Sequence, residues 1–304
     1  MRSSDSPNDS VRTALAAAIA SICFGTSVVA TRFAVAEVKP ISLVFFRYTI
    51  GSALLLPVMW QVVRASLPRR DVIEIGMLGM LFFGVFPWTF SASLTHSPSA
   101  RVAVELATMP LITLFISRLR GYDKITAPKL AGQLLAFVGL VIALRPAAAK
   151  TVDPTSTVWI GDILAGTTAL LGAVYNVFSR PYLKRYPPLQ VTTLSMYAGL
   201  LFLAPIAAMN GTFSAAPAFT RTGWLALLFL GSLGGAFGFA LWIWALQRST
   251  PSRVAVFIAL NPMTAIALGV LLLHEPVTTP FLFGFVLVIA GIVLANVGTR
   301  RVAD

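Results

Sequence analysis

Long apolar segments are the feature that most constrains how this chain can fold. Each is close to the ~20 residues that a helix needs to cross ~30 Å of hydrocarbon. Ten of them lie at 14–35, 41–63, 72–93, 98–119, 127–145, 158–180, 190–209, 223–246, 252–273 and 279–298. A bilayer offers no hydrogen-bond partner to a free backbone group, so only helices and closed barrels span it, and barrel strands would alternate in polarity. The sequence therefore predicts an all-α membrane protein with ten transmembrane helices.

The composition agrees with a membrane protein and excludes other classes. Of the 304 residues, 57% are hydrophobic and only 11% are charged, whereas a soluble domain carries about a quarter charged residues. The net charge of +12 does not indicate a nucleic-acid partner, because the basic residues lie between apolar segments and not along one face. Cys23 is the single cysteine, which excludes an internal disulfide and a cysteine metal cluster. No metal or cofactor is expected.

The basic residues predict an orientation in the membrane. When the N-terminus is placed in the cytoplasm, sixteen lysines and arginines fall in inside segments and six fall outside. Because cytoplasmic loops are enriched in these residues, we expect a multi-pass protein of the cytoplasmic (inner) membrane with both termini in the cytoplasm. The opening residues, MRSSDSPNDS, lack the charged-then-apolar pattern of a cleaved signal peptide.

The chain contains an internal repeat. RVAVELATMP (101–110) and RVAVFIALNP (253–262) are identical at six of ten positions and lie 152 residues apart, which is half of the 304-residue length. At the same offset, Phe90 matches Trp242, Asp123 matches Glu275, Gly132 matches Gly284 and Gly139 matches Gly291. Each copy holds five spans, and five is odd, so the copies are expected to run in opposite directions through the membrane. Such repeats place a substrate site near the midplane, where the halves meet, and expose it to each side in turn.

The repeat sets the predicted domain limits. Residues 1–13 form a polar cytoplasmic N-terminus, 14–145 the first five-span repeat, 146–157 a linker loop, 158–298 the second repeat and 299–304 a cytoplasmic C-terminus.

Three stretches resemble EamA-type members of the drug/metabolite transporter superfamily. FGTSVVATRFA (24–34) is similar to the family's opening motif, with Phe24 and Arg32 in place of tryptophan and lysine. ISLVFFRYTIGSALLL (41–56) is similar to the second-helix motif, with Arg47 at its arginine. The stretch 245–294 is similar to the most recognisable part of the family, and it carries the mid-helix proline Pro262, the acidic residue Glu275 and the glycines Gly284 and Gly291.

The resemblance implies a transporter fold and function. It implies transport, commonly the export of amino acids or related metabolites, through a cavity lined mainly by helices 1, 3, 4, 6, 8 and 9. Two residues depart from the family pattern: Asp123 replaces a glutamate, and Glu105 stands where the family is usually apolar. Arg47, Asp123 and Glu275 are interpreted as structural charges. For Arg47, the alternative is that it attracts an anionic group of the substrate.

Glu105 is the most informative candidate in the substrate pathway. It lies about seven residues into the fourth span, roughly 10 Å deep at 1.5 Å per residue. A charge at such a position costs at least ~2.5 kcal/mol and marks a functional site by default. The matching residue in the other copy is Phe257, so the fold does not require the carboxylate. We expect Glu105 to carry a proton or to bind a substrate ammonium group. The alternative is an ion pair with Arg101, four residues away on the same helical face.

The other pathway candidates are prolines, amides and aromatic rings inside spans. Pro110 and Pro262 each remove a helical hydrogen bond and are expected to kink their helices, with Asn261 beside Pro262 offering a donor and an acceptor. The remaining pathway candidates are Trp88, Phe90, Tyr175, Asn176 and Trp242. Small-molecule cavities are mostly apolar with a few polar groups, and an aromatic ring can hold an ammonium group. The alternative for each ring is lipid contact or packing.

The sequence favours an alternating-access transporter of a small organic solute, with protons as the candidate coupling ion. An importer or exchanger of a larger polar solute, such as a sugar or nucleotide sugar, is the first alternative, although few cations lie within the spans. An intramembrane enzyme is the second, but no catalytic cluster or Ser/His/Asp motif is present. The expected partners are a small-molecule substrate and the lipid bilayer. The chain is expected to be a monomer or a homodimer.

Overall fold

The computed structural model describes residues 7–35, 37–65, 67–97, 99–148, 158–214, 219–273 and 279–297, and every regular element in these ranges is a helix. Nine helical segments there are long and apolar enough to cross a membrane, and a bent helix pair provides a tenth. The predicted all-α membrane fold with ten spans is confirmed.

Five spans are formed by continuous helices and five by interrupted ones. The continuous helices are α1 (Pro7–Val35), α8 (Ala127–Ala148), α9 (Val158–Phe178), α11 (Pro188–Met209) and α16 (Thr279–Val297). The interrupted spans are α2 (Pro40–Leu54) with α3 (Leu56–Arg64), α4 (Arg69–Gly79) with η1 (Met80–Val85) and α5 (Phe86–His96), α6 (Ser99–Leu106) with α7 (Met109–Leu119), α12 (Arg221–Gly231) with η2 (Ser232–Phe237) and α13 (Gly238–Arg248), and α14 (Pro251–Ala255) with η3 (Val256–Ala259) and α15 (Leu260–Leu273). The short helix α10 (Arg180–Leu183) follows α9.

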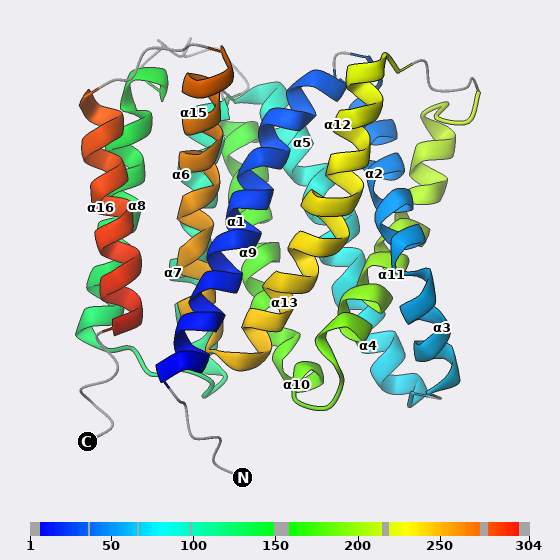
Figure 1. Cartoon of the computed structure of the whole chain (residues 1–304), viewed down its shortest axis with the longest axis horizontal. Coiled ribbons are helices and arrows are strands. Elements are labelled where there is room, and N and C mark those ends of the chain that lie inside the picture. The colour runs from blue at the N-terminus through cyan, green and yellow to red at the C-terminus, as the bar shows by residue number, and fades with distance from the viewer. Residues whose placement is uncertain are drawn as a thin grey trace. The chain divides into compact units, whose positions relative to one another are not determined.

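The internal repeat is visible in the backbone itself. In the third and eighth spans, the α-helix, the π-helix and the following α-helix begin and end at positions that are all 152 residues apart. The two π-helices, for example, begin at Met80 and Ser232. In Figure 1 the chain enters α4 at the bottom of the view, whereas it enters α12 at the top and runs down into α13. Equivalent helices therefore run in opposite directions, as expected of an inverted repeat.

The second span is bent, which corrects the continuous helix expected over 41–63. Its two halves meet at an angle of 63°. The bend lies just before Pro57, which has no N–H to donate to the carbonyl of Ala53 and clashes with that carbonyl. Leu55 instead donates its N–H to Gly51 and Ser52 at 3.2 and 3.1 Å. Pro205 lies inside α11 without a break, so a proline alone does not cause such a bend.

The chain forms two compact units, and each draws helices from both halves of the sequence. The first unit contains residues 1–80 and 179–250. Within it, α1 packs along α12 and α13, and α11 packs against α2, α3 and α4. A buried apolar cluster of Ala34, Leu43, Leu227 and Leu230 joins α1, α2 and α12. The domain limits proposed for the two repeats stay a prediction.

The second unit contains residues 81–178 and 251–304. Here α9 packs against α5, α6 and α7, while α8 and α16 form a close pair that lies side by side in Figure 1. Glycines allow the close approach, because a Cβ on Gly139 would lie 2.7 Å from the carbonyl oxygen of Gly284. A Cβ on Gly132 would lie 2.6 Å from the carbonyl oxygen of Gly291. Small residues at such positions let membrane helices pack backbone to backbone.

Candidate functional site

The fourth span is broken just after Glu105, the pathway candidate with the strongest sequence signal. The α-helix ends at Leu106, and a turn at Ala107 and Thr108 precedes α7. The Thr108 N–H and hydroxyl both donate to the Glu105 carbonyl, at 3.0 and 2.6 Å. The Glu105 side chain is half-buried, and its carboxylate oxygen Oε2 is shielded from solvent. The side chain of Arg101 lies outside the described residues, so the proposed ion pair with Glu105 stays a prediction.

Both predicted kink prolines lie in the first turn of a helix that follows an interruption. Pro110 is buried in the first turn of α7, just beyond the break at Ala107 and Thr108. Pro262 occupies the first turn of α15, just beyond the 3₁₀ segment η3. Asn261 lies beside Pro262, and its buried side-chain oxygen Oδ1 has no hydrogen-bond partner within the described part of the chain. A polar atom in this situation needs a partner, such as a water molecule or a ligand.

Tyr175 and Asn176 are both fully buried in the second unit, on α9. The Tyr175 ring stacks on Phe82 with a centroid separation of 4.2 Å and an interplanar angle of 9°. The Asn176 amide donates to the sulfur of Met109 at 4.0 Å. Met109 directly precedes Pro110, so the structure brings Asn176 against the first turn of α7, the second helix of the broken fourth span.

The three remaining aromatic candidates have different surroundings. The Trp88 side chain is 52% exposed, whereas Trp242 is 1% exposed and packs near Phe24 at 6.0 Å between centroids. Phe90 is half-buried. The burial of Trp242 and Phe90 therefore differs, although they are equivalent in the repeat. Their roles in a substrate pathway stay predictions.

Among the charges interpreted as structural, Asp123 is held by an ion pair and several hydrogen bonds. Asp123 forms an ion pair with Lys129, and each side chain is 3% exposed. Asp123 also accepts hydrogen bonds from the Ser252 hydroxyl and, at 3.0 Å, from the Lys124 N–H. Gln133 donates its amide to the Ser252 carbonyl at 3.1 Å. This cluster ties the α7–α8 loop to the first turn of α14. Glu275, the repeat equivalent of Asp123, lies outside the described residues.

Arg47 lies in the interior of α2. Its guanidinium carbon is 5.3 Å from the centre of the Tyr48 ring. Its Nε is buried and has no hydrogen-bond partner among the residues that the structure describes. The interpretation of Arg47 as a structural charge therefore stays a prediction.

Arg47→Gln provides a test of that interpretation. If the charge holds the fold, the variant is expected to give little folded protein in detergent, measured by size-exclusion chromatography. Normal yield with lost substrate binding would instead place Arg47 in the substrate pathway.

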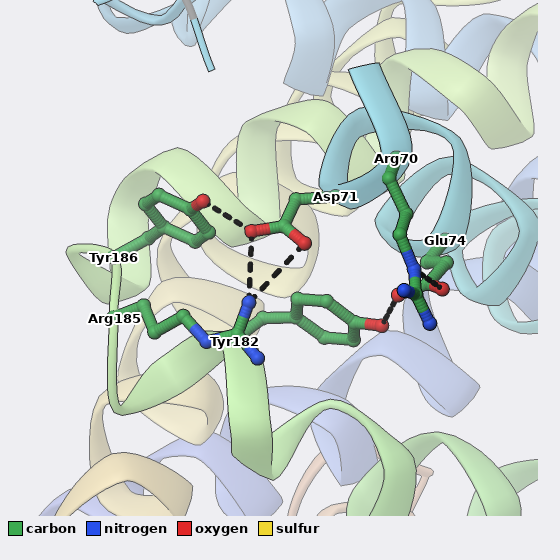
Figure 2. A network of polar contacts seen from close by, with 6 residues as sticks. All are labelled: Arg70, Asp71, Glu74, Tyr182, Arg185 and Tyr186. Carbon is green, nitrogen blue, oxygen red and sulfur yellow. Dashed lines mark hydrogen bonds and ion pairs between the residues drawn. The ribbon is translucent and has the colours of Figure 1, made fainter. Parts of the chain in front are cut away.

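A polar network at the start of α4 was not predicted from the sequence. Figure 2 shows six side chains that join α4 to α10 and to the loop that follows it: Arg70, Asp71, Glu74, Tyr182, Arg185 and Tyr186. The Arg185 guanidinium lies 3.2 and 3.0 Å from the two oxygens of Asp71, and the Tyr186 hydroxyl donates to the same carboxylate. The hydrogen bond to Asp71, aided by burial, raises the pKa of Tyr186. Two carboxylates at the start of a span were the sequence signal for this network.

In the same network, Glu74 accepts from the Tyr182 hydroxyl and from Arg70, at 2.9 Å for the latter.

A carboxylate also lies at the start of α12, but it comes from a position that is not equivalent in the repeat. At the start of α12, the equivalent of Asp71 is Gly223, and Glu37 supplies the carboxylate. It accepts from the Thr220 N–H at 2.8 Å and from the Thr220 hydroxyl at 2.6 Å. A carboxylate at the beginning of a helix stabilises that helix, because its negative charge interacts favourably with the positive end of the helix dipole.

The sequence and the fold of this chain are similar to those of known proteins. The model of the EamA-like transporter family matches residues 11–145 and 159–297. A crystal structure superposes with a TM-score of 0.79 at 21% identity and covers 96% of this chain and 99% of that chain, which supports the fold alone. An "Uncharacterized transporter" of Archaeoglobus fulgidus is 24% identical over 274 residues, which is 88% of this chain and 93% of that protein.

Two further relatives carry more specific names. A "Probable terminal-alkyne amino-acid exporter" of Streptantibioticus cattleyicolor is 28% identical over 243 residues, which is 78% of each chain. A "Probable amino-acid metabolite efflux pump" of Salmonella typhimurium is 22% identical over 286 residues, which is 92% of this chain and 93% of that protein.

Proposed function

The chain belongs to the EamA-like transporter family, and from this premise we propose that it is an alternating-access exporter of amino acids or related small metabolites. The proposal includes no catalytic step. Two relatives whose names refer to amino-acid export support this substrate class, although their identities are 28% and 22%. The excess of basic residues in alternate loops supports a cytoplasmic membrane location with both termini in the cytoplasm.

The observation that carries the proposal is the position of Glu105. This carboxylate lies in the last turn before a helix break, and one of its oxygens is shielded from solvent. The other copy of the repeat has Phe257 at the same place, so a structural need does not explain the charge. A broken helix inside a span frees backbone groups, which transporters use to line a substrate cavity. A carboxylate there matches the ammonium group that all free amino acids carry.

Proton coupling is the second part of the proposal. A carboxylate with a shielded oxygen can bind a proton in one state and a substrate ammonium group in another. Such an exchange would couple outward movement of the solute to inward movement of a proton. Two further polar groups belong to the same unit: the Asn176 amide, which contacts Met109, and the buried side-chain oxygen of Asn261.

The test is uptake into proteoliposomes of a labelled panel of twenty amino acids, with and without a pH gradient. Saturable, gradient-driven uptake of a subset is expected. If folded protein moves none of them, while labelled sugars or nucleotide sugars are taken up, the amino-acid proposal is wrong and the importer alternative replaces it.

Glu105→Gln is expected to reduce uptake by about ten- to a hundredfold, because a hydrogen bond to a charged group contributes about 1.5–3 kcal/mol. Stimulation by the pH gradient is expected to disappear, because glutamine binds no proton. Asp162→Asn is the matched control, since it removes a carboxylate from the same unit and keeps an acceptor for the Ser97 hydroxyl, 3.1 Å away. Unchanged rate and unchanged gradient response in Glu105→Gln would rule out both roles.

A further inference from the structure

The bent second span has an apolar face that no other described helix covers. On α3, Leu56, Trp60 and Val63 are 59%, 61% and 63% exposed. Their spacing of four and three residues places them on one side of the helix. We call these three residues the α3 stripe. In a membrane protein such a face contacts lipid.

Positive charge lies at the end of the α3 stripe. Arg64 ends α3, and Arg69 begins α4. The short connection between two consecutive spans must lie at one surface of the bilayer, so both arginines lie at the depth of lipid headgroups. The Arg64 guanidinium lies 4.9 Å from the centre of the Trp60 ring. Tryptophan is enriched at this depth because its ring is apolar and its N–H is polar.

The nearby acidic groups are already engaged, which leaves these two arginines available. Asp71 is paired with Arg185, and Glu74 is paired with Arg70. Arg64 and Arg69 form no ion pair within the described part of the chain. Arg248 shows the contrast: it also lies over a tryptophan four residues earlier, but it donates to the Gln247 side chain at 3.0 Å.

We propose that this corner of the first unit binds one anionic phospholipid. An acyl chain lies along the α3 stripe, and the headgroup phosphate is held by Arg64 and Arg69. The guanidinium fork suits a phosphate because it can donate two parallel hydrogen bonds. The site belongs to the first unit, whereas Glu105 belongs to the second, and the proposal does not depend on the proposed transport activity.

The experiment is a lipid titration of the full chain in detergent, followed by native mass spectrometry. The probes are phosphatidylglycerol, phosphatidylcholine and inorganic phosphate. One phosphatidylglycerol is expected to bind tightly, phosphatidylcholine weakly, and phosphate is not expected to displace the lipid. The double variant Arg64→Gln/Arg69→Gln should weaken phosphatidylglycerol binding by about thirtyfold, equivalent to about 1 kcal/mol for each basic residue near an anionic headgroup.

The matched control is Arg221→Gln/Arg248→Gln. Arg221 is the repeat equivalent of Arg69, and both control arginines are exposed. This variant removes the same charge and should bind phosphatidylglycerol as the native protein does. An equal loss in both double variants would show that only net charge matters, and would overturn the proposal. Equal binding of the two lipids by the native protein would overturn it without any variant. Trp60→Ala should also weaken binding, because it removes the central ring of the α3 stripe.

Discussion

Lys129→Met is expected to destabilise the folded protein by about 3–5 kcal/mol, because it leaves a buried charge without its counter-ion. Asp123 and Lys129 are each only 3% exposed. Without Lys129, the Asp123 carboxylate keeps the hydrogen bonds from the Ser252 hydroxyl and the Lys124 N–H, which do not neutralise its charge. The measurement is the midpoint of thermal unfolding in detergent, followed by size-exclusion chromatography.

Lys124→Met is the matched control for this prediction. Lys124 adjoins Asp123 in the chain, but its side chain is exposed, so its loss should cost well under 1 kcal/mol. The double variant Asp123→Asn/Lys129→Met should recover part of the stability, since a neutral pair carries no unpaired charge. Similar midpoints for Lys129→Met and Lys124→Met would show that the buried pair contributes nothing specific.

The cluster also bears on the ninth span. Ser252 lies in the first turn of α14, and it is held by Asp123 through its hydroxyl and by Gln133 through its carbonyl. At the same offset of 152 residues, Lys129 and Gln133 correspond to Phe281 and Phe285. The polar cluster is therefore a property of one copy of the repeat. It fixes the start of the span that carries Asn261 and Pro262.

The sequence predicted the spans well because the bilayer imposes a simple rule on length and polarity. It also predicted the inverted repeat, since the offset of 152 residues persists in the π-helices at Met80 and Ser232. It did not predict those π-helices or the bend at Leu55. Both features arise where individual backbone hydrogen bonds change partner because of local packing. A hydropathy profile averages over many residues and so does not detect such single positions.

Side-chain partners were harder to predict than helices. Asp123 was interpreted as a structural charge, but Ser252, the partner that fixes α14, lies 129 residues away in the chain. The network of Asp71 with Arg185 and Tyr186 was missed for the same reason, because these residues meet only when α4 and α10 are in place. Glu105 was found from the sequence because a carboxylate inside an apolar segment is a local signal, which can be recognised without knowledge of its partners.

Gly139→Ala is expected to destabilise the protein by about 1–3 kcal/mol, although alanine favours helices more than glycine does. The new Cβ would lie 2.7 Å from the Gly284 carbonyl oxygen and 2.9 Å from the Val288 nitrogen. These are backbone atoms, so α8 and α16 must separate to make room. Gly284→Ala should have the same effect, since its Cβ would lie 2.3 Å from the Gly139 carbonyl oxygen.

Gly166→Ala on α9 is the control that isolates this contact. Gly166 is also helical and belongs to the same unit, but a Cβ there would meet nothing within 4 Å. The gain of up to ~1 kcal/mol from helix propensity is then the only effect, so the two variants should shift the unfolding midpoint in opposite directions. An increase in the midpoint for both variants would mean that α8 and α16 can separate without cost. Because Gly132, Gly139, Gly284 and Gly291 are repeat equivalents in pairs, each copy supplies half of one symmetric contact, and a change in either copy opens the same helix pair.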